Sequence, residues 1–471
     1  MPETAGQRGI GTICDKMPTT YWKLAKHQVY ASEMMDSNPQ LGIFYEAGCG
    51  KTMCVLDYLY RQFKTKQITN ALVICPASIV SSWKTSIEKM AKFKGYTGYG
   101  ISMMLKLVDV RSFQRTYERK PTQVRHRDGT VETKSVLKIR SEINHEWGAI
   151  IVDESQGLGA HDSVQTKICL QLAELTPRRF IMSGTPVSGG GGKEDFKKLY
   201  GQLKFLNPDL WPNWKAFCEE LVTGYDYFGK PNRYKVEQCR ELMRNFGIVA
   251  RLNDCYDMPS SLDAMVPVEL NTRREYEDVR KGDTEKFGIE LKTGGAAYLK
   301  LLELCSGFIL DDNKNATEYP TQKLDAVKQI IRGTEDKVVI FCNFRNSIDR
   351  VAKVCEAHGK TVIYDGRSKG DTWRDFQYGD ARYLVAQYQS GGVGIDLFSS
   401  HTMIFYEPTT SSLLMEQAKA RIMRKGQEQK CIFHWIYADN SIEKRVAETV
   451  KPGVEVTREM LEEWAKLKKL D

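Results

Sequence analysis

Short runs of apolar, mostly β-branched residues alternate along the chain with longer polar or amphipathic stretches. Seven runs stand out, at 71–75, 149–152, 179–182, 337–341, 361–364, 383–386 and 403–406. Continuous apolar runs of this length are typical of strands that are buried on both faces, as in a parallel sheet covered by helices. The runs form two clusters, so the pattern predicts an α/β fold with two parallel-sheet lobes in tandem.

Between the two clusters, residues 193–335 show helical spacing and few strand signals, which predicts a helical insertion. The segment 115–140 is rich in Lys and Arg with little apolar periodicity, and we expect an exposed hairpin or loop there. The expected organisation is a first ATP-binding lobe over 18–245, a linker with the helical insertion over 246–325, a second lobe over 326–455, and a terminal helix over 456–471.

Composition restricts the class of protein. The chain has 471 residues, 41% of them apolar, and its 68 Lys and Arg against 60 Asp and Glu give a net charge of +8, which permits a polyanionic partner without requiring one. Its 12 Cys include no CxxC pair, which argues against a zinc site and a disulfide framework. No stretch reaches the roughly 18 apolar residues of a membrane span. We therefore expect an intracellular protein without membrane contact, cytoplasmic in a bacterial or virus-infected cell and nuclear in a eukaryote.

A glycine-rich turn near the start of the chain can hold phosphates. Gly48, Cys49 and Gly50 let backbone N–H groups approach phosphate oxygens, Lys51 can reach the terminal phosphates, and the Thr52 hydroxyl can ligate Mg²⁺. The strict pattern has Gly or Ala five residues before Gly50, where this chain has Tyr45, so a plain turn is the alternative. ATP and Mg²⁺ are the expected cofactors.

Two carboxylates follow the apolar run at 149–152. We expect Asp153 to hold Mg²⁺ and Glu154 to orient or deprotonate the attacking water. Adjacent acidic residues after a strand often form only a solvated turn, but a phosphate loop upstream favours the catalytic interpretation.

Two arginines near the end of the chain have the spacing of one helical turn. Arg421 and Arg424 can therefore point from one helix face toward a γ-phosphate in the facing lobe, where arginines stabilise the charge that develops in phosphoryl transfer. A basic solvated helix face is the alternative, and the flanking Gln417 and Gly426-Gln427 argue against it.

The ordered set of motifs resembles superfamily II helicase-like ATPases, and within them the Swi/Snf-type DNA translocases. The set comprises LAKHQ at 24–28, the phosphate loop, CPAS at 75–78 with Trp83, DESQ at 153–156, SGTPV at 183–187, SGGVGID at 390–396 and QAKARIMRKGQ at 417–427. The resemblance covers about residues 20–450, and the last segment is its most specific piece. It implies two RecA-like lobes with ATP in the cleft between them.

The resemblance also implies roles for single residues. It implies that Gln28 reads adenine, that Gln156 hydrogen-bonds across the cleft, and that Gly394 and Asp396 lie at the nucleotide edge of the second lobe. Ser183 and Thr185 would couple hydrolysis to lobe movement and contact nucleic acid. The remaining members of the implied nucleic-acid track are Pro76, Ser78, Asn343, Arg345 and Ser390.

Two departures and the length limit what is carried over. The segment 188–192 is Ser-Gly-Gly-Gly-Gly in place of the family's Gln-Asn-Asn-like sequence, and DESQ replaces the commoner DEAH or DEAQ. The length leaves no room for the reader domains of chromatin remodellers, so we expect a bare motor of viral or bacterial kind. The first hypothesis is a translocase on double-stranded DNA. The alternatives are a strand-separating DNA or RNA helicase, and a nucleotide-gated binding module that no longer hydrolyses ATP.

Overall fold

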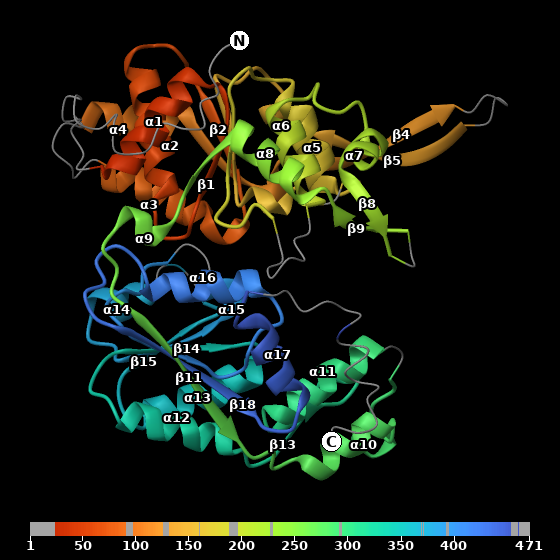
Figure 1. The fold of residues 1–471 in the computed structure, drawn as a ribbon, viewed down its shortest axis with the longest axis vertical. Coiled ribbons are helices and arrows are strands. Elements are labelled where there is room, and N and C mark those ends of the chain that lie inside the picture. Colours follow the sequence, from red (N-terminus) through yellow and green to blue (C-terminus); the bar gives the residue numbers. More distant parts are fainter. Residues whose placement is uncertain are drawn as a thin grey trace. The chain divides into compact units, whose positions relative to one another are not determined.

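The computed structural model describes residues 24–90, 98–125, 131–159, 161–187, 196–226, 229–291, 294–368, 370, 372–391, 395–453 and 460. These residues form two compact units, the first ending at Asp257 and the second beginning at Met258. Each unit is built around a six-stranded sheet in which every pairing is parallel. The predicted fold class, two parallel-sheet α/β lobes in tandem, is confirmed (Figure 1).

In the first unit the sheet has the strand order β10-β1-β7-β6-β2-β3. Its strands are β1 (Gln40–Tyr45), β2 (Ala71–Cys75), β3 (Val108–Ser112), β6 (Ala149–Asp153), β7 (Arg179–Met182) and β10 (Gly247–Ala250). Its helices are α1 (Lys26–Ser37), α2 (Lys51–Lys64), α3 (Val80–Met90), α4 (Gly98–Leu107), α5 (Val164–Ala173), α6 (Lys198–Leu206), α7 (Trp214–Leu221), α8 (Val236–Phe246) and α9 (Leu252–Cys255). Two antiparallel hairpins stand apart from the sheet, β4 (Tyr117–Arg125) with β5 (Val131–Ile139) and β8 (Val222–Tyr225) with β9 (Pro231–Tyr234).

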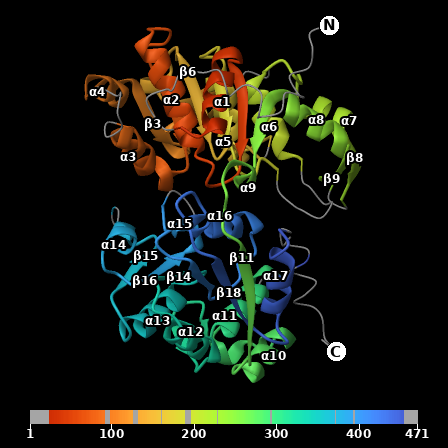
Figure 2. The same ribbon diagram turned by 60° about the vertical axis from the view of Figure 1, so that its left-hand side comes forward.

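Side-chain alternation explains why both faces of the first sheet are covered. Phe180 on β7 packs edge-on against Tyr58 of α2, with ring centroids 5.1 Å apart. Its neighbour Ile181 points to the opposite face and joins the core cluster formed with α5 and α6. Helices α1 to α4 therefore lie on one side of the sheet and α5, α6 and α8 on the other, as the turned view makes visible (Figure 2).

In the second unit the strand order is β11-β18-β17-β14-β16-β15. Its strands are β11 (Ser261–Val268), β12 (Phe308–Leu310), β13 (Ala316–Glu318), β14 (Val338–Cys342), β15 (Thr361–Tyr364), β16 (Tyr383–Gln387), β17 (Thr402–Phe405) and β18 (Cys431–Ala438), of which β12 and β13 form a separate antiparallel pair. Its helices are α10 (Arg273–Lys281), α11 (Gly294–Cys305), α12 (Gln322–Arg332), α13 (Arg345–Glu356), α14 (Trp373–Tyr378), α15 (Tyr388–Gly391), α16 (Ser412–Ile422) and α17 (Ile442–Val450).

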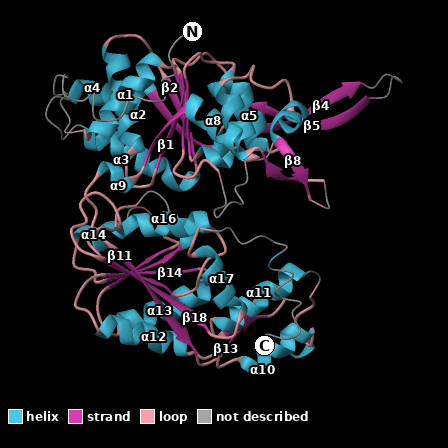
Figure 3. Cartoon of the chain, viewed as in Figure 1, coloured by secondary structure: helices cyan, strands magenta, loops and turns pink. Residues whose placement is uncertain are grey.

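The second sheet is also buried on both faces. Val338 and Ile340 of β14 pack with α12 and α13, whereas Val339 and Phe341 of the same strand pack with the cluster that includes α11, α14, α16 and α17. Figure 3 shows strands enclosed by helices in each unit. None of the described helices has the length and apolar content that crossing a membrane requires.

All seven strands predicted from apolar runs are present, as β2, β6, β7, β14, β15, β16 and β17. Five further strands of the two sheets were missed, namely β1, β3, β10, β11 and β18. The stretch 193–335 contains helices α6 to α12, as expected, but it also contains six short strands, so its description as poor in strands was wrong. The segment 115–140 is a hairpin, as predicted. Within the terminal segment 456–471, only Met460 is among the described residues, and the domain boundaries stay a prediction.

Candidate functional site

The phosphate loop connects β1 to α2 at the carboxyl edge of the first sheet. Gly48 and Gly50 have φ angles of 93° and 79°, in the left-handed region that favours glycine. A Cβ atom at Gly50 would lie 2.2 Å from Nε2 of Gln28, so the close approach of α1 also requires glycine there. Helix α2 begins at Lys51, and its free N–H groups are therefore directed toward the loop, as an anion site requires.

Tyr45, the departure from the strict phosphate-loop pattern, is accommodated without disturbing the loop. Its side chain is buried, and its hydroxyl donates to the carbonyl of His27 on α1 at 2.8 Å. Its own carbonyl accepts a hydrogen bond from Nζ of Lys51 at 2.8 Å. The backbone of Gly184 is close to the same ammonium, because a Cβ atom there would lie 3.5 Å from Nζ. Lys51 is thus held at the loop by the carbonyl of Tyr45, and its ammonium lies close to the turn after β7.

Gln28, which we expected to read adenine, contacts the phosphate loop. Its Oε1 accepts from the backbone N–H of Ala25 at 3.0 Å, and its Nε2 donates to the carbonyl of Cys49 at 3.1 Å. The ring of His27 contacts the same carbonyl, with Nε2 at 2.9 Å. His27 was not among the predicted site residues, although its place beside Gln28 could have suggested it. The adenine role of Gln28 stays a prediction.

Asp153, the last residue of β6, and Glu154 after it stand at the carboxyl edge of the sheet, with one strand, β7, between β6 and the strand β1 that leads into the phosphate loop. The Oδ2 atom of Asp153 accepts from the indole N–H of Trp83 at 2.8 Å, and its Oδ1 accepts from the backbone N–H of Glu154 at 2.9 Å. Burial, together with the nearby Glu154 carboxylate, raises the pKa of Asp153 to about 7. A buried carboxylate with this environment favours a bound cation, since a cation would offset the cost of its charge.

Glu154 begins a line of hydrogen bonds that runs from the carboxylates to the turn after β7. Its backbone adopts φ 50°, and its Oε2 accepts from Nε2 of Gln156 at 2.6 Å. Oε1 of Gln156 accepts from the hydroxyl of Ser183 at 2.7 Å, and Oγ of Ser183 accepts from the N–H of Thr185 at 3.0 Å. The turn after β6 and the turn after β7 are therefore linked through side chains. Ser183 is buried in this line, while its assignment to the nucleic-acid track stays a prediction.

A second link, through helix α6, joins the same two turns. The hydroxyl of Ser155 donates to Oε1 of Gln202 on α6 at 2.8 Å, and Nε2 of Gln202 donates to the carbonyl of Pro186 at 2.6 Å. Both side chains have no exposed surface. Helix α6 lies so close that a Cβ atom at Gly201 would be 2.2 Å from the carbonyl oxygen of Leu158. Sequence reasoning missed Gln202, although a Gln between Leu199 and Leu203 on an apolar helix face is a detectable signal.

In the second unit, both predicted arginines meet at one carbonyl group. Nη1 of Arg421 donates to the carbonyl of Ile395 at 3.1 Å, and Nη1 of Arg424 donates to the same oxygen at 3.3 Å. Arg424 also forms an ion pair with Asp396. Helix α16 ends at Ile422, so the prediction that both arginines project from one helix face was wrong, and Arg424 belongs to the turn that follows. Gly394 lies outside the described residues.

The residues predicted for the nucleic-acid track lie at strand ends in both units. Ser78 is exposed and Pro76 half-buried just after β2. After β14, Arg345 is exposed, whereas the side chain of Asn343 donates to the carbonyl of Pro408 at 3.0 Å. Ser390, in α15, follows the adjacent strand β16. Their contact with nucleic acid stays a prediction.

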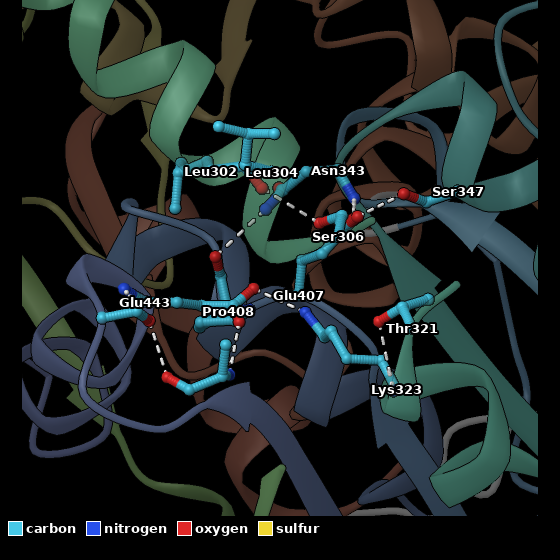
Figure 4. A network of polar contacts seen from close by, with 12 residues as sticks. Leu302, Leu304, Ser306, Thr321, Lys323, Asn343, Ser347, Glu407, Pro408 and Glu443 are labelled. Carbon is cyan, nitrogen blue, oxygen red and sulfur yellow. Dashed lines mark hydrogen bonds and ion pairs between the residues drawn. The ribbon is translucent and has the colours of Figure 1, made fainter. Parts of the chain in front are cut away.

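Buried charges support the strand ends of the second unit (Figure 4). Glu407, which follows β17, accepts from the backbone N–H of Asn343 at 2.6 Å and from the hydroxyl of Ser347. Lys323 and Glu443 form an ion pair with Nζ and Oε1 2.6 Å apart, and neither side chain is more than 1% exposed. The Glu407 contacts join the ends of β14 and β17 to α13, and the ion pair joins α12 to α17.

No cluster of three or more His, Cys, Asp or Glu residues with metal-binding geometry occurs in the described part of the chain. Mg²⁺ commonly keeps several waters and takes one or two carboxylates together with substrate phosphates. Asp153 and Thr52, beside the phosphate loop, fit such a sparse site better than a cage made entirely of protein ligands.

Comparison with family models gives two matches. The model of the SNF2-related domain matches residues 29–320, and the model of the helicase conserved C-terminal domain matches residues 322–426.

Curated relatives are similar over most of this chain. The DNA repair protein rhp54 of Schizosaccharomyces pombe is 24% identical over 467 residues, which cover 85% of this chain and 53% of that protein. An "Uncharacterized ATP-dependent helicase" of Mycoplasma pneumoniae is 25% identical over 443 residues, covering 89% and 40%. The chain spans about half the length, or less, of these relatives. Among solved structures, the Sulfolobus solfataricus SWI2/SNF2 ATPase core in complex with dsDNA matches with a TM-score of 0.40 and 17% identity, covering 94% of this chain and 93% of that one.

Proposed function

Because this chain belongs to the SNF2-related family, with a helicase C-terminal domain following, we propose that it is an ATP-dependent translocase on double-stranded DNA. The observation that supports this most is the linked pair of turns in the first unit. There the carboxylates of Asp153 and Glu154 are joined through Gln156 to Ser183, and the Lys51 ammonium lies close to Gly184. A change at the phosphates can thereby reach the turn after β7. We also propose an intracellular site of action, where DNA is available.

In the proposed mechanism, the N-terminus of α2 and the ammonium of Lys51 bind the phosphates of ATP. Thr52 and Asp153 would hold Mg²⁺, which supplies charge neutralisation at the β- and γ-phosphates when it is bound. Glu154 would accept the proton of the attacking water, and its hydrogen bond from Gln156 keeps the carboxylate oriented toward that task. The second unit would contribute Arg421 and Arg424 to the terminal phosphate during turnover.

For these arginines to act, their contacts within the second unit must change. Arg424 forms an ion pair with Asp396, and both arginines donate to the carbonyl of Ile395. We propose that a bound γ-phosphate competes for these donors. Asp396 then serves to hold Arg424 near the turn between turnovers, which agrees with its expected place at the nucleotide edge.

The test compares ATP hydrolysis with single-stranded DNA, blunt duplex DNA, branched DNA and RNA at one salt concentration. We expect duplex DNA to stimulate hydrolysis, and the protein to displace the third strand of a triplex while separating a plain duplex poorly. Unwinding of a tailed duplex together with no stimulation by blunt duplex would instead establish the strand-separating helicase. Absence of hydrolysis under every condition would leave the nucleotide-gated binding module.

A further inference from the structure

The hairpin β4–β5 lies between β3 and β6 in the chain and does not belong to the sheet of the first unit. Its strands pair in one uninterrupted antiparallel register from Tyr117–Ile139 to Arg125–Val131. Strands of nine residues are roughly 27 Å long. Figures 1 and 3 show them projecting from the unit, and among the hairpin side chains that the structure describes, those of Tyr117, Leu137 and Ile139 at the base pack against the core. The described part of the hairpin therefore joins the core at its base and projects away from it.

Positive charge is concentrated in this hairpin. From Arg115 to Arg140 there are eight basic residues and three acidic ones, an excess of five, whereas the entire chain has an excess of only eight. More than half of the net charge therefore lies in a 26-residue segment. Arg119 and Lys138 are both exposed, and their positions in the register place them on opposite faces of the hairpin. Edge strands often carry lysine to prevent aggregation, but that purpose does not require positive charge on both faces.

The base of the hairpin is fixed at the ligand-binding edge of the sheet. Ser112, the last residue of β3, is the register partner of Cys75, and Cys75 directly precedes Pro76 of the predicted nucleic-acid track. The backbone N–H of Arg140 donates to the carbonyl of Thr116 at 3.1 Å, and Nε of Arg140 donates to the carbonyl of Tyr117 at 3.0 Å. The hairpin thus begins next to the predicted track and is held firmly where it begins.

We propose that the exposed basic side chains which the structure describes at the base of this hairpin, those of Arg115, Arg119, Lys120 and Lys138, form a second phosphate-binding surface, which extends the nucleic-acid track of the first unit along the backbone of duplex DNA. This inference rests on the proposed function for the identity of the polyanion. The interaction is electrostatic and independent of sequence, because exposed Lys and Arg contact phosphates without reading base edges. It requires neither ATP nor closure of the catalytic site, so the hairpin keeps the protein on its track between hydrolysis cycles.

The test uses the full chain with Arg119→Gln and Lys138→Gln together, which neutralises two charges while keeping side chains that suit an exposed strand. The matched control is Lys64→Gln with Lys66→Gln. These two exposed lysines precede β2 and so lie toward the amino-terminal ends of the strands, away from the carboxyl edge. Binding of a 40-base-pair duplex is measured without nucleotide by fluorescence anisotropy across a salt series. Hydrolysis is measured with and without the duplex.

For the hairpin variant, we expect the slope of log affinity against log salt to become shallower by about two, with an affinity loss on the order of 10- to 100-fold at 0.1 M salt. Hydrolysis without DNA should equal that of the unchanged protein, and the DNA concentration giving half-maximal stimulation should rise. The control should change neither slope nor affinity. If the hairpin variant binds the duplex as tightly as the original protein, the proposal is overturned and an acidic protein partner becomes the alternative. If DNA does not stimulate hydrolysis by the original protein, the proposed function itself is overturned.

Discussion

Replacing Gln202 by leucine should impair catalysis more than it impairs ATP binding. Leucine preserves the approximate shape of the side chain and suits the apolar face of α6, but it removes the acceptor of Ser155 and the donor to Pro186. The Ser155 hydroxyl would remain buried, whereas Pro186 is half-buried. Of the two side-chain links described between the turns after β6 and β7, the line from Glu154 through Gln156 to Ser183 would then remain.

The expected magnitude follows from the groups left without partners. A buried polar group that loses its partner costs about 1–3 kcal/mol. The Ser155 hydroxyl is such a group, whereas the carbonyl of the half-buried Pro186 can bond to water, so after the added apolar burial of leucine we expect a loss of about 1–2 kcal/mol in unfolding free energy. If the lost link displaces Glu154 by about 1 Å, kcat should fall on the order of 100-fold. The KM for ATP should change little, since the phosphate loop keeps its own contacts.

A double-mutant cycle separates this effect from general destabilisation. Ser155→Ala removes the hydroxyl that Gln202→Leu leaves without a partner, so the double variant should be more active than the sum of the single effects predicts, by about 1 kcal/mol or more. Asn70→Leu is the matched control. Its amide also joins two backbone groups, accepting from Gly148 N–H at 2.7 Å and donating to the carbonyl of Glu146 at 3.2 Å, but at the amino end of β6.

The assays are urea unfolding and steady-state ATP hydrolysis on the same preparations. The control should lose stability while keeping kcat. If Gln202→Leu behaves in the same way as the control, the link is structural only and the catalytic reasoning is wrong. If Gln202→Leu changes neither stability nor kcat, the hydrogen bonds of Gln202 do not contribute in solution.

Four further predictions concern the site. Lys51→Ala should abolish ATP binding in a fluorescent-nucleotide titration, and binding at the unchanged affinity would remove Lys51 from the site. Glu154→Gln should bind ATP normally but hydrolyse it slowly in single-turnover assays, and a loss of binding would make Glu154 structural. Arg421→Ala and Arg424→Ala should each lower kcat far more than they raise KM, which wild-type turnover by either variant would contradict. Burial raises the pKa of Asp153 to about 7, so between about pH 4 and 7 the unfolded chain releases a proton that the folded chain retains, and stability falls as pH rises. The Asp153→Asn variant should not show this loss. In EDTA, its unfolding free energy in urea minus that of the unchanged protein should therefore be larger at pH 8 than at pH 5, and an equal difference at both pH values would contradict the raised pKa of Asp153.

The sequence predicted the strands that consist of uninterrupted apolar runs, because burial on both faces leaves that pattern. Strands of mixed composition were missed for physical reasons. β1 contains Gly42, where a Cβ atom would lie 2.6 Å from the Phe44 ring, and glycine weakens a strand signal. β11 lies at the edge of its sheet and contains Pro267, which only an edge strand or a bulge tolerates.

The site divides in the same way. Motif spacing predicted Lys51, Asp153 and Glu154, since the chemistry proposed for them depends on their place within a short segment. Trp83 and Gln202 take part through contacts between segments 70 and 47 residues apart. Such pairs are set by the order of strands and by helix packing, and that order is not readable from a single local pattern. The end of α16 at Ile422, before Arg424, likewise depends on packing that spacing alone does not reveal.

The buried pair of Lys323 and Glu443 has a consequence for how the second unit can change over generations. Removing one member leaves a buried charge without its partner, at a cost of about 3–5 kcal/mol, whereas replacing both by well-packed apolar residues can be neutral or stabilising. The two residues lie 120 positions apart, so the apolar pair requires two separate mutations. The first of them produces a poorly folded protein with one unpaired buried charge. Inheritance should therefore keep both or exchange both. An alignment of relatives should show the two positions covarying, with mixed combinations depleted relative to chance.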